Sequence, residues 1–301
     1  MPDSVSNVQI KAYTDLVMLA AQQEGSKTRR WCEVKTGVAG ESVSFDTLGT
    51  VELQAKPSRH TLTPSADPNH GRRWAQIAAY HAAIPVDKND VTTMIADPTS
   101  SYVKLLGFAT GRKWDSIILS AAIGTAQTGV SNAPGATALG SETWPFTDRK
   151  SVSHRITESG TVGLTVAKLR QAKRIYDALS MPSGGRVLFV DAYGIEDLLE
   201  TTEVTSADYN TVKALVSGDL DTFLGFKFET VDSDLMTVSS SIVSAVAMHQ
   251  GAVGVGFNVD QWTRIWERTD RSGDMEAYIN TALGAVRRSG ERIVEIQYYQ
   301  S

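Results

Sequence analysis

The sequence predicts a mixed α+β fold organised around one long helix, and three stretches of the chain lead to this prediction. Residues 97–125 have the pattern of a long helix, residues 35–84 that of an extended β-ribbon, and residues 262–299 that of three closing strands. An α/β segment separates the helix from the closing strands, so these strands should pair with parts of the chain that are distant in sequence. This order predicts one discontinuous domain and argues against a doubly wound sheet.

The helix expected at residues 97–125 has clear start signals and one apolar face. Asp97 is a favourable N-cap, and Pro98 suits the first helical position, where its missing N–H is not needed. Apolar residues then recur at helical spacing: Val103, Leu106, Trp114, Ile117, Ile118 and Ala121. Charged residues fall mostly on the opposite side: Lys104, Arg112, Lys113 and Asp115. A continuous helix of this length would rise about 40 Å.

Two glycines, Gly107 and Gly111, lie inside this helix. Each weakens a helix interior by roughly 1 kcal/mol relative to alanine. We therefore expect either a break in the helix or a neighbouring backbone that comes close to the glycine face. The alternative is an ordinary core helix that tolerates both glycines.

The chain before the long helix should form a terminal helix and a β-ribbon, and both need partners. Residues 8–23 have an apolar face with nothing adjacent in sequence to cover it, so this helix must dock elsewhere in its own chain or on a neighbour's. Residues 31–34 and 42–48 alternate like strands around a glycine-rich turn. Residues 73–89 have the pattern of a returning strand that Pro85 ends.

Within the ribbon, the stretch 50–73 is rich in proline and in basic residues. Its acidic residues are Glu52 and Asp67. They are outnumbered by lysine and arginine side chains: Lys56, Arg59, Arg72 and Arg73. A two-stranded ribbon is marginal alone in water, and long irregular excursions usually have a function. We infer that another surface covers this arm; the alternative is an ordinary surface hairpin.

After the long helix, the chain alternates between helices and strands. Residues 127–160 are rich in glycine, alanine and threonine and should form a loop. Residues 186–190, RVLFV, are fully apolar and should form a central strand. Helices are expected at 165–179, 192–200 and 206–215, and further strands at 223–231, 262–267, 275–288 and 292–299.

Composition and charge exclude several classes of function. The 301 residues carry a net charge of −5, so bulk attraction to DNA is not expected. Cys32 is the one cysteine, which excludes an intramolecular disulfide and fits an intracellular site. The N-terminal stretch lacks a signal-peptide layout, and the least polar run, 242–257, is too short to span a membrane. We expect a soluble, cytoplasmic protein without membrane contact.

The motifs reveal no catalytic, cofactor or metal site. There is no nucleophile elbow and no P-loop. Gly251, Gly254 and Gly256 have the wrong spacing for a dinucleotide turn and should instead allow a close backbone approach. Cys32 has no histidine nearby in sequence and should be a buried structural residue. The histidines form no metal-binding pair, and the short aspartate pairs near turns should be solvated, so we expect neither an enzyme nor a cofactor.

The order of the expected elements resembles that of the major capsid proteins of tailed bacteriophages with the Hong Kong 97-type fold. The resemblance covers nearly the whole chain and includes RVLFVDAYGIEDLLE (186–200), LGFKFETVD (224–232), AVAMHQGAVGVGF (245–257) and the segment 262–297. It implies five regions: an N-terminal arm at 1–34, an extended loop or β-arm at 35–84, a peripheral domain with its spine helix at 85–164, an axial domain at 165–259, and closing strands of the peripheral domain at 260–301.

The resemblance implies a structural protein that assembles into hexamers and pentamers and closes an icosahedral shell around double-stranded DNA. Its partners would be copies of itself, with portal and scaffolding proteins, in a virion assembled in the host cytoplasm. DNA would lie nearby without specific binding, because the net negative charge keeps it from the wall. The basic arm would dock on an acidic neighbouring surface. We expect contacts between subunits to include Lys56, Arg59, Arg72, Arg73 and Trp74.

Three alternatives stay open at this point. An encapsulin-type bacterial compartment shares the fold but encloses cargo enzymes. An α/β enzyme would use the crevice beside the strand and helix at 186–200 as its active site. The arginines next to Trp74 could stack on nucleic acid, although a buried tryptophan with flanking surface arginines is the simpler interpretation.

Overall fold

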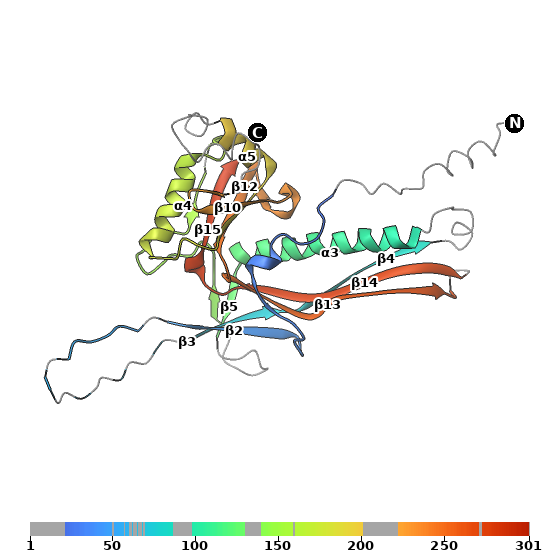
Figure 1. Cartoon of the computed structure of the whole chain (residues 1–301), viewed down its shortest axis with the longest axis horizontal. Helices are drawn as coiled ribbons and strands as arrows, with labels where there is room; N and C mark the ends of the chain where they lie inside the picture. The colour runs from blue at the N-terminus through green and yellow to red at the C-terminus, as the bar shows by residue number, and fades with distance from the viewer. Residues whose placement is uncertain are drawn as a thin grey trace.

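The computed structural model shows an elongated molecule that contains three sheets in the part of the chain it describes. It describes residues 22–49, 51–56, 58–59, 62, 65, 68, 70–86, 98–129, 140–158, 160–200, 222–270 and 273–300. A compact α/β unit lies at one end, the long helix α3 (Pro98–Ile123) runs along an elongated sheet, and a β-ribbon points away from both (Figure 1). The predicted class of mixed helix and sheet is confirmed.

The compact unit is built on a seven-stranded sheet. Its strands are β7 (Arg155–Ile156), β8 (Arg186–Val190), β9 (Thr222–Phe223), β10 (Phe226–Thr230), β11 (Thr237–Ser239), β12 (Ile242–His249) and β15 (Ile293–Tyr299). They follow the order β7-β15-β12-β8-β10-β9, with β11 beside β12. Antiparallel β12 and parallel β10 flank β8, and all its side chains are buried. The prediction of a central apolar strand is therefore confirmed.

Helices α4 (Val166–Ala178) and α5 (Ala192–Glu200) belong to this unit and match their predicted ranges closely. Thr165 caps α4, because its side chain accepts a hydrogen bond from a backbone N–H of the first turn. The buried Tyr176 of α4 donates a hydrogen bond from its hydroxyl to the Ala247 carbonyl of β12 (2.8 Å). The helix is thus hydrogen-bonded to the sheet as well as packed on it.

Helix α3 lies along a four-stranded sheet with the order β1-β13-β14-β4. The strands are β1 (Glu33–Lys35), β4 (Ala78–Val86), β13 (Val253–Arg268) and β14 (Asp274–Arg287). Alternate residues of β14 face the helix. Ala277 and Ile279 pack on Leu106 of α3. Thr281, the next residue on this face, accepts a hydrogen bond from the Trp114 indole N–H (3.1 Å).

The third sheet forms the base of the ribbon and has the order β2-β3-β5-β6. Its strands are β2 (Ser42–Leu48), β3 (His70–Gln76), β5 (Ala126–Thr128) and β6 (Gly140–Glu142). A small apolar core lies at this base: Val43, Phe45, Ala75, Ala126 and Val286. Because Val286 belongs to β14, this core attaches the ribbon to the body.

Helix α3 is continuous through both of its glycines. A Cβ atom at Gly111 would lie 2.5 Å from the carbonyl carbon of Gly25, so the backbone of the N-terminal segment approaches the helix there. At Gly107 the nearest neighbour would be the Gln261 amide nitrogen at 3.8 Å. The predicted close approach is therefore confirmed at Gly111, whereas Gly107 is a tolerated glycine.

Two strand predictions are wrong in the first part of the chain. The stretch 73–89, expected as one strand, is divided at Ile77 between β3 and β4, which lie in different sheets. Pro85 lies inside β4 instead of ending it, because β4 is an edge strand and an edge tolerates proline. The chain at 31–34 forms a 3-10 turn, η1 (Arg29–Trp31), and then β1, which pairs in parallel with β13 and not with β2.

Other stretches contain more strands than expected. The supposed loop 127–160 contributes to β5, β6 and β7: β5 and β6 pair with each other, and β5 and β7 also pair with β3 and β15, which are distant in sequence. The expected strand 223–231 is broken at Leu224 and Gly225, whose positive φ angles form a tight turn between β9 and β10. Strand β13 begins at Val253, well before the predicted start, because its first residues pair with both β1 and β14.

The closing strands are divided between two sheets. Strands β13 and β14 form the sheet beside α3, whereas β15 enters the seven-stranded sheet and pairs with β12 along its whole length. Short 3-10 turns precede β11 and β15: η2 (Ser233–Leu235) and η3 (Gly290–Arg292). Residues 8–21 of the expected terminal helix and the expected helix at 206–215 lie outside the described residues.

Candidate functional site

The base of the ribbon joins the arm to the body. Strands β2 and β3 pair along their full lengths, and the chain beyond them points away from the rest of the molecule (Figure 1). Phe45 and Val43 of β2 pack over Gly254 and Gly256 of β13. Cβ atoms at these glycines would lie 2.7 and 2.3 Å from the two side chains. The glycines therefore make room for side chains, whereas the sequence predicted a close backbone approach.

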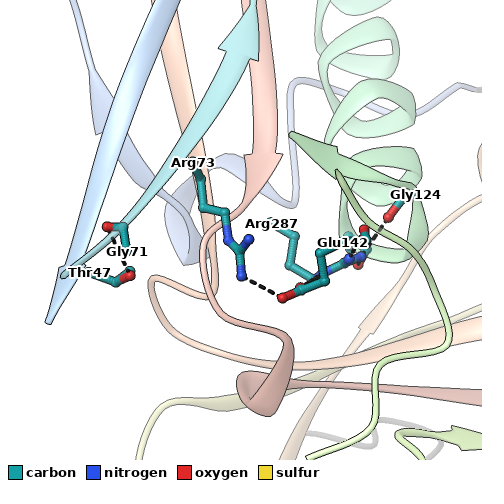
Figure 2. Close-up of polar contacts among 7 residues, drawn as sticks. Thr47, Gly71, Arg73, Gly124, Glu142 and Arg287 are labelled. Carbon is teal, nitrogen blue, oxygen red and sulfur yellow. Dashed lines mark hydrogen bonds and ion pairs between the residues drawn. The ribbon is translucent and has the colours of Figure 1, made fainter. Parts of the chain in front are cut away.

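Three charged side chains, which we name the Arg73–Glu142–Arg287 cluster, lie where the ribbon leaves the body (Figure 2). The Glu142 carboxylate on β6 accepts a hydrogen bond from Arg73 Nη2 of β3 through Oε2. It accepts another from Arg287 Nε of β14 through Oε1 (3.2 Å). Arg287 also donates to three backbone carbonyls: those of Glu142 (2.9 Å), Gly124 (2.6 Å) and Ala122 (3.2 Å). The Glu142 carboxylate thus connects the arm to β14, and Arg287 connects both to the end of α3.

Arg287 is the fully buried member of this cluster. Burial lowers the pKa of its guanidinium, and the charge of Glu142 opposes that effect. Its bonds to the last carbonyls of α3 place a cation where the helix dipole favours positive charge. The Trp144 ring centroid lies 4.9 Å from the guanidinium carbon, which adds a cation–π contact. A buried charge of this kind depends on its carboxylate partner.

The neighbouring Arg72 points to the opposite face of β3. It pairs with Asp46 of β2 (Nε to Oδ1, 2.5 Å), so this ion pair joins the two strands of the ribbon to each other. The hydrogen bond from Arg72 lowers the pKa of the Asp46 carboxyl. Adjacent arginines therefore have different tasks, because Arg73 connects the ribbon to β6 and Arg72 connects it internally.

The residues that the sequence placed at contacts between subunits lie in two environments. Arg73 and Trp74 are half-buried and bonded within the subunit, Trp74 through its indole N–H to the Gly129 carbonyl (3.1 Å). Lys56 and Arg59 are exposed beyond the ends of β2 and β3. The outer part of the arm therefore presents Lys56 and Arg59 to solvent, whereas Arg73 and Trp74 belong to its base.

The arm also exposes large apolar side chains. The exposed fractions are 70% for Leu48, 100% for Leu53 and 92% for Leu62. Single exposed leucines are common on protein surfaces, but several along one extended ribbon make a surface that favours contact with another protein.

A second exposed apolar surface lies toward the far end of β13 and β14. The rings of Trp262, Trp266 and His81 surround Tyr278, with centroids 5.9, 5.2 and 6.1 Å from its own. The residues before and after Tyr278 pack on α3, so these rings lie on the opposite face of the sheet. Trp262 is 46% exposed. We name this surface the aromatic face (His81, Trp262, Trp266 and Tyr278).

Asp115 anchors the N-terminal segment on α3. Its buried carboxylate accepts hydrogen bonds from several donors: Gln23 Nε2, Ser26 Oγ (2.5 Å), the Lys27 N–H (3.0 Å), the Thr28 N–H (3.1 Å) and Thr28 Oγ1 (2.6 Å). The prediction that Asp115 lies on the polar side of the helix is wrong, because the segment before η1 covers this position. The signal available in the sequence was its place between the apolar residues Trp114 and Ile118.

Glu142 and Arg287 are functional residues that the sequence did not predict. Arg287 lies in a run of apolar residues at the end of β14, where a charged side chain signals a buried ion pair. Glu142 lies in a stretch without periodic pattern, and only the pairing of β5 with β6 brings it to the cluster.

The crevice suggested for an α/β enzyme is filled by structural contacts. Asp191, directly after β8, accepts hydrogen bonds through Oδ1 from the Gly194 N–H (2.8 Å) and the Tyr298 hydroxyl. The described residues around the adjacent cavity include no histidine or cysteine. Burial raises the pKa of the Cys32 thiol, which keeps it protonated and unreactive.

The described part of the chain contains no group of three or more histidine, cysteine or carboxylate side chains that could hold a metal ion. Within the same ranges, no helix is both long enough and apolar enough to cross a bilayer.

Comparison with known proteins relates the chain to one family. The sequence matches the phage capsid protein family over residues 5–300. No curated protein matches it. Similar solved structures include the capsid of cyanophage P-SCSP1u, which is 15% identical, with a TM-score of 0.66 over 96% of this chain and 94% of that chain. Mycobacterium phage Che8 gives 15% identity and a TM-score of 0.66 over 94% and 95%. The head of Helicobacter pylori bacteriophage KHP40 gives 10% identity and a TM-score of 0.67 over 95% of each chain.

Proposed function

The chain belongs to the phage capsid protein family, and from this premise we propose that it is the major capsid protein of a tailed phage with a Hong Kong 97-type fold. The protein assembles into hexamers and pentamers that close an icosahedral shell around double-stranded DNA, in a virion assembled in the host cytoplasm. Portal and scaffolding proteins are its further partners. The family and the fold support a structural role, and we propose no catalytic activity.

The regions of the proposed capsid protein follow the chain, and several strands cross their boundaries to pair in a sheet of another region. Residues 1–34 are the N-terminal arm, and residues 35–84 are the extended loop. Residues 85–164 and 260–301 form the peripheral domain around α3. Residues 165–259 form the axial domain, and β15 adds a strand to its sheet.

One observation carries the proposal: the arm exposes apolar side chains that it cannot bury by itself. Leu53 and Leu62 are almost completely exposed on a ribbon with few neighbours. An isolated ribbon of this kind is marginal in water. A neighbouring copy of the chain would supply the missing apolar contacts.

We propose that the arm docks on the aromatic face of a neighbouring copy. The arm and the far ends of β13 and β14 lie at opposite ends of the molecule (Figure 1), so they do not meet within one chain. A contact between two different surfaces can close into a ring. The charges are complementary, because residues 50–73 hold four basic and two acidic residues, whereas residues 260–276 hold five acidic and three basic ones. The rings also attract cations such as Lys56 and Arg59.

Each such contact need only be weak. A contact of about −4 to −8 kcal/mol corresponds to millimolar to micromolar affinity. Many contacts on each subunit then close the shell through effective concentration.

The test is charge reversal at the outer part of the arm, by Lys56→Glu combined with Arg59→Glu. Arg72 and Arg73 are unsuitable targets, because both form ion pairs within the subunit. We expect closed particles to be lost in electron micrographs while the thermal unfolding of the subunit is unchanged. The matched control, Lys56→Arg with Arg59→Lys, keeps both charges and should assemble like the parent. Unchanged particle yield in the reversed variant would contradict the proposed docking.

A further inference from the structure

Strand pairing and side chains of β3 attach the ribbon to the body. The side chains of β3 on the body side are, toward the tip, Ala75, then Arg73, then the position of Gly71. Ala75 lies in the small apolar core, and Arg73 bonds to Glu142. At Gly71 there is no side chain, and Thr47 Oγ1 of β2 donates to its carbonyl within the ribbon (3.2 Å; Figure 2). Arg73 thus forms an ion pair between β3 and the body, and next to it the Arg72 carbonyl accepts a hydrogen bond from the Gly129 N–H (3.3 Å).

We propose that the Arg73–Glu142–Arg287 cluster is a latch that holds the arm at a fixed angle to helix α3, with Arg73 as the positioning residue. The inference rests on the proposed function in one respect, because the direction of the arm matters only if the arm must reach a neighbour.

The two halves of the cluster differ in how easily they separate. Arg287 is fully buried and holds Glu142 together with the last carbonyls of α3, so this half is part of the fold. The Arg73 side chain is 18% exposed at the edge of the cluster. If the Arg73–Glu142 bond opens, Glu142 still neutralises Arg287, and the Arg73 guanidinium can turn toward water. This ion pair can therefore open, and the arm can change its angle, without leaving a buried charge unpaired.

The body side of the latch is attached to the end of α3, so the angle of the arm is defined relative to this helix. Arg287 binds the carbonyls of Ala122 and Gly124 at the end of the helix and both carboxylate and carbonyl of Glu142. The body side of the latch is therefore fixed to the helix end by several hydrogen bonds. On the arm side, Arg73 acts together with the backbone pairing of β3 with β5, the Trp74 bond to the Gly129 carbonyl and the small apolar core.

The chain contains a matched control for Arg73. Arg72 has the same charge, lies one residue away on the same strand and also forms an ion pair, but its partner Asp46 belongs to the ribbon. Loss of the Arg72 pair should leave the angle of the arm unchanged, because that pair does not connect the ribbon to the body.

The angle can be measured by pulsed electron spin resonance between spin labels on the arm and on the body of the full-length chain. Exposed Gln54 on the arm and exposed Gln171 on α4 are replaced by cysteine for labelling, in a background that carries Cys32→Ser. Labelled chains are diluted with unlabelled ones, so the measured distances lie within one chain whether or not particles form.

We expect a narrow distance distribution in the labelled parent and a broadened, shifted one in Arg73→Met. A charge-assisted bond of this kind should change the ratio of latched to released arms by about tenfold, or about 1.4 kcal/mol. Arg73→Lys keeps the charge and should stay close to the parent, and Arg72→Met should match the parent.

Two results would overturn the latch. One is an unchanged narrow distribution in Arg73→Met, and the other is equal broadening in Arg72→Met. Should Arg73→Met fail to fold, Arg73→Gln keeps a polar side chain and gives the same test. The readout lies within one chain, so a negative result here leaves the proposed shell function intact, and a failure to form particles leaves the latch testable.

Discussion

The seven-stranded sheet and the arm differ in the burial of their apolar side chains. All side chains of β8 are buried, whereas Leu53 of the arm is completely exposed. The first region completes its core with helices and strands of its own chain. The second can complete one only against another surface. We infer that substitutions in the sheet should act on folding, and substitutions in the arm on association.

The largest expected effect contrasts Phe189→Ala in β8 with Leu53→Ala in the arm. Phe189 is fully buried, and truncation of a buried phenylalanine costs about 3–5 kcal/mol. Leu53→Ala removes an exposed side chain and should change the free energy of unfolding by less than about 0.5 kcal/mol. Urea unfolding of both variants measures the difference. Similar losses in the two variants would show that the arm packs on its own subunit.

The next effect concerns the N-terminal segment, which is part of neither region and is attached to the body by Asp115. Asp115→Ala leaves several buried donors without an acceptor and should cost about 3 kcal/mol in unfolding free energy. The control Asp115→Asn keeps one acceptor oxygen and should lose less. Protease cleavage within residues 22–28 should become faster in Asp115→Ala. A stability equal to that of the parent would contradict the role of this anchor.

A smaller effect is the difference in stability change between alanine substitutions at the two glycines of α3. Gly111→Ala should destabilise the protein by about 1–3 kcal/mol, because the added methyl group meets the backbone of Gly25. At Gly107 an added Cβ would make only an ordinary contact with Gln261 Nε2 (3.8 Å), so Gly107→Ala should stabilise the helix by up to about 1 kcal/mol. Thermal unfolding of the two variants should therefore shift in opposite directions. Shifts of the same sign would mean that the close approach does not constrain α3.

The smallest effect is a pH dependence within the compact unit. Burial raises the pKa of Asp148. Hydrogen bonds from the Val152 N–H (2.9 Å) and the Lys150 N–H (2.8 Å), together with the contact to His154, lower that pKa by more than burial raises it. The net pKa therefore lies below its ordinary value. The folded state therefore binds this proton more weakly than the unfolded state. The resulting stability is present above the unfolded pKa, about 3.9, and is lost as the pH falls through the folded pKa.

Asp148→Asn removes this contribution. Its unfolding free energy should fall less steeply than that of the parent between about pH 5 and about pH 3. Urea titrations across this range compare the two slopes. Parallel slopes would show that Asp148 contributes nothing to the acid dependence.

Elements with a local signal could be predicted from the sequence. Helix α3 has a proline start and an apolar stripe, α4 has the Thr165 cap, and β8 is a continuous apolar run, and all three were located correctly. The partners of strands could not be predicted. Strand β15 has the same alternating pattern as β14, yet it enters another sheet, because pairing depends on edges that only the folded body provides.

The site was predicted less completely than the fold. Exposed Lys56 and Arg59 follow from the composition of the arm, because a proline-rich basic stretch cannot build a core. The role of Arg73 could not be predicted, because its partner Glu142 is distant in sequence and lies in a stretch without pattern. Adjacent Arg72 and Arg73 look equivalent in the sequence. They have different partners because successive side chains of β3 point to opposite faces of the sheet.

The most direct test of the central claim, that the arm finds its missing contacts in another copy, is electron microscopy of a chain without the arm. Residues 50–68 are replaced by an Asn-Gly turn, which closes β2 and β3 into a short hairpin. We predict a subunit that unfolds at the parental temperature and forms no closed particles under conditions in which the parent does. Closed particles at the parental yield would contradict the claim.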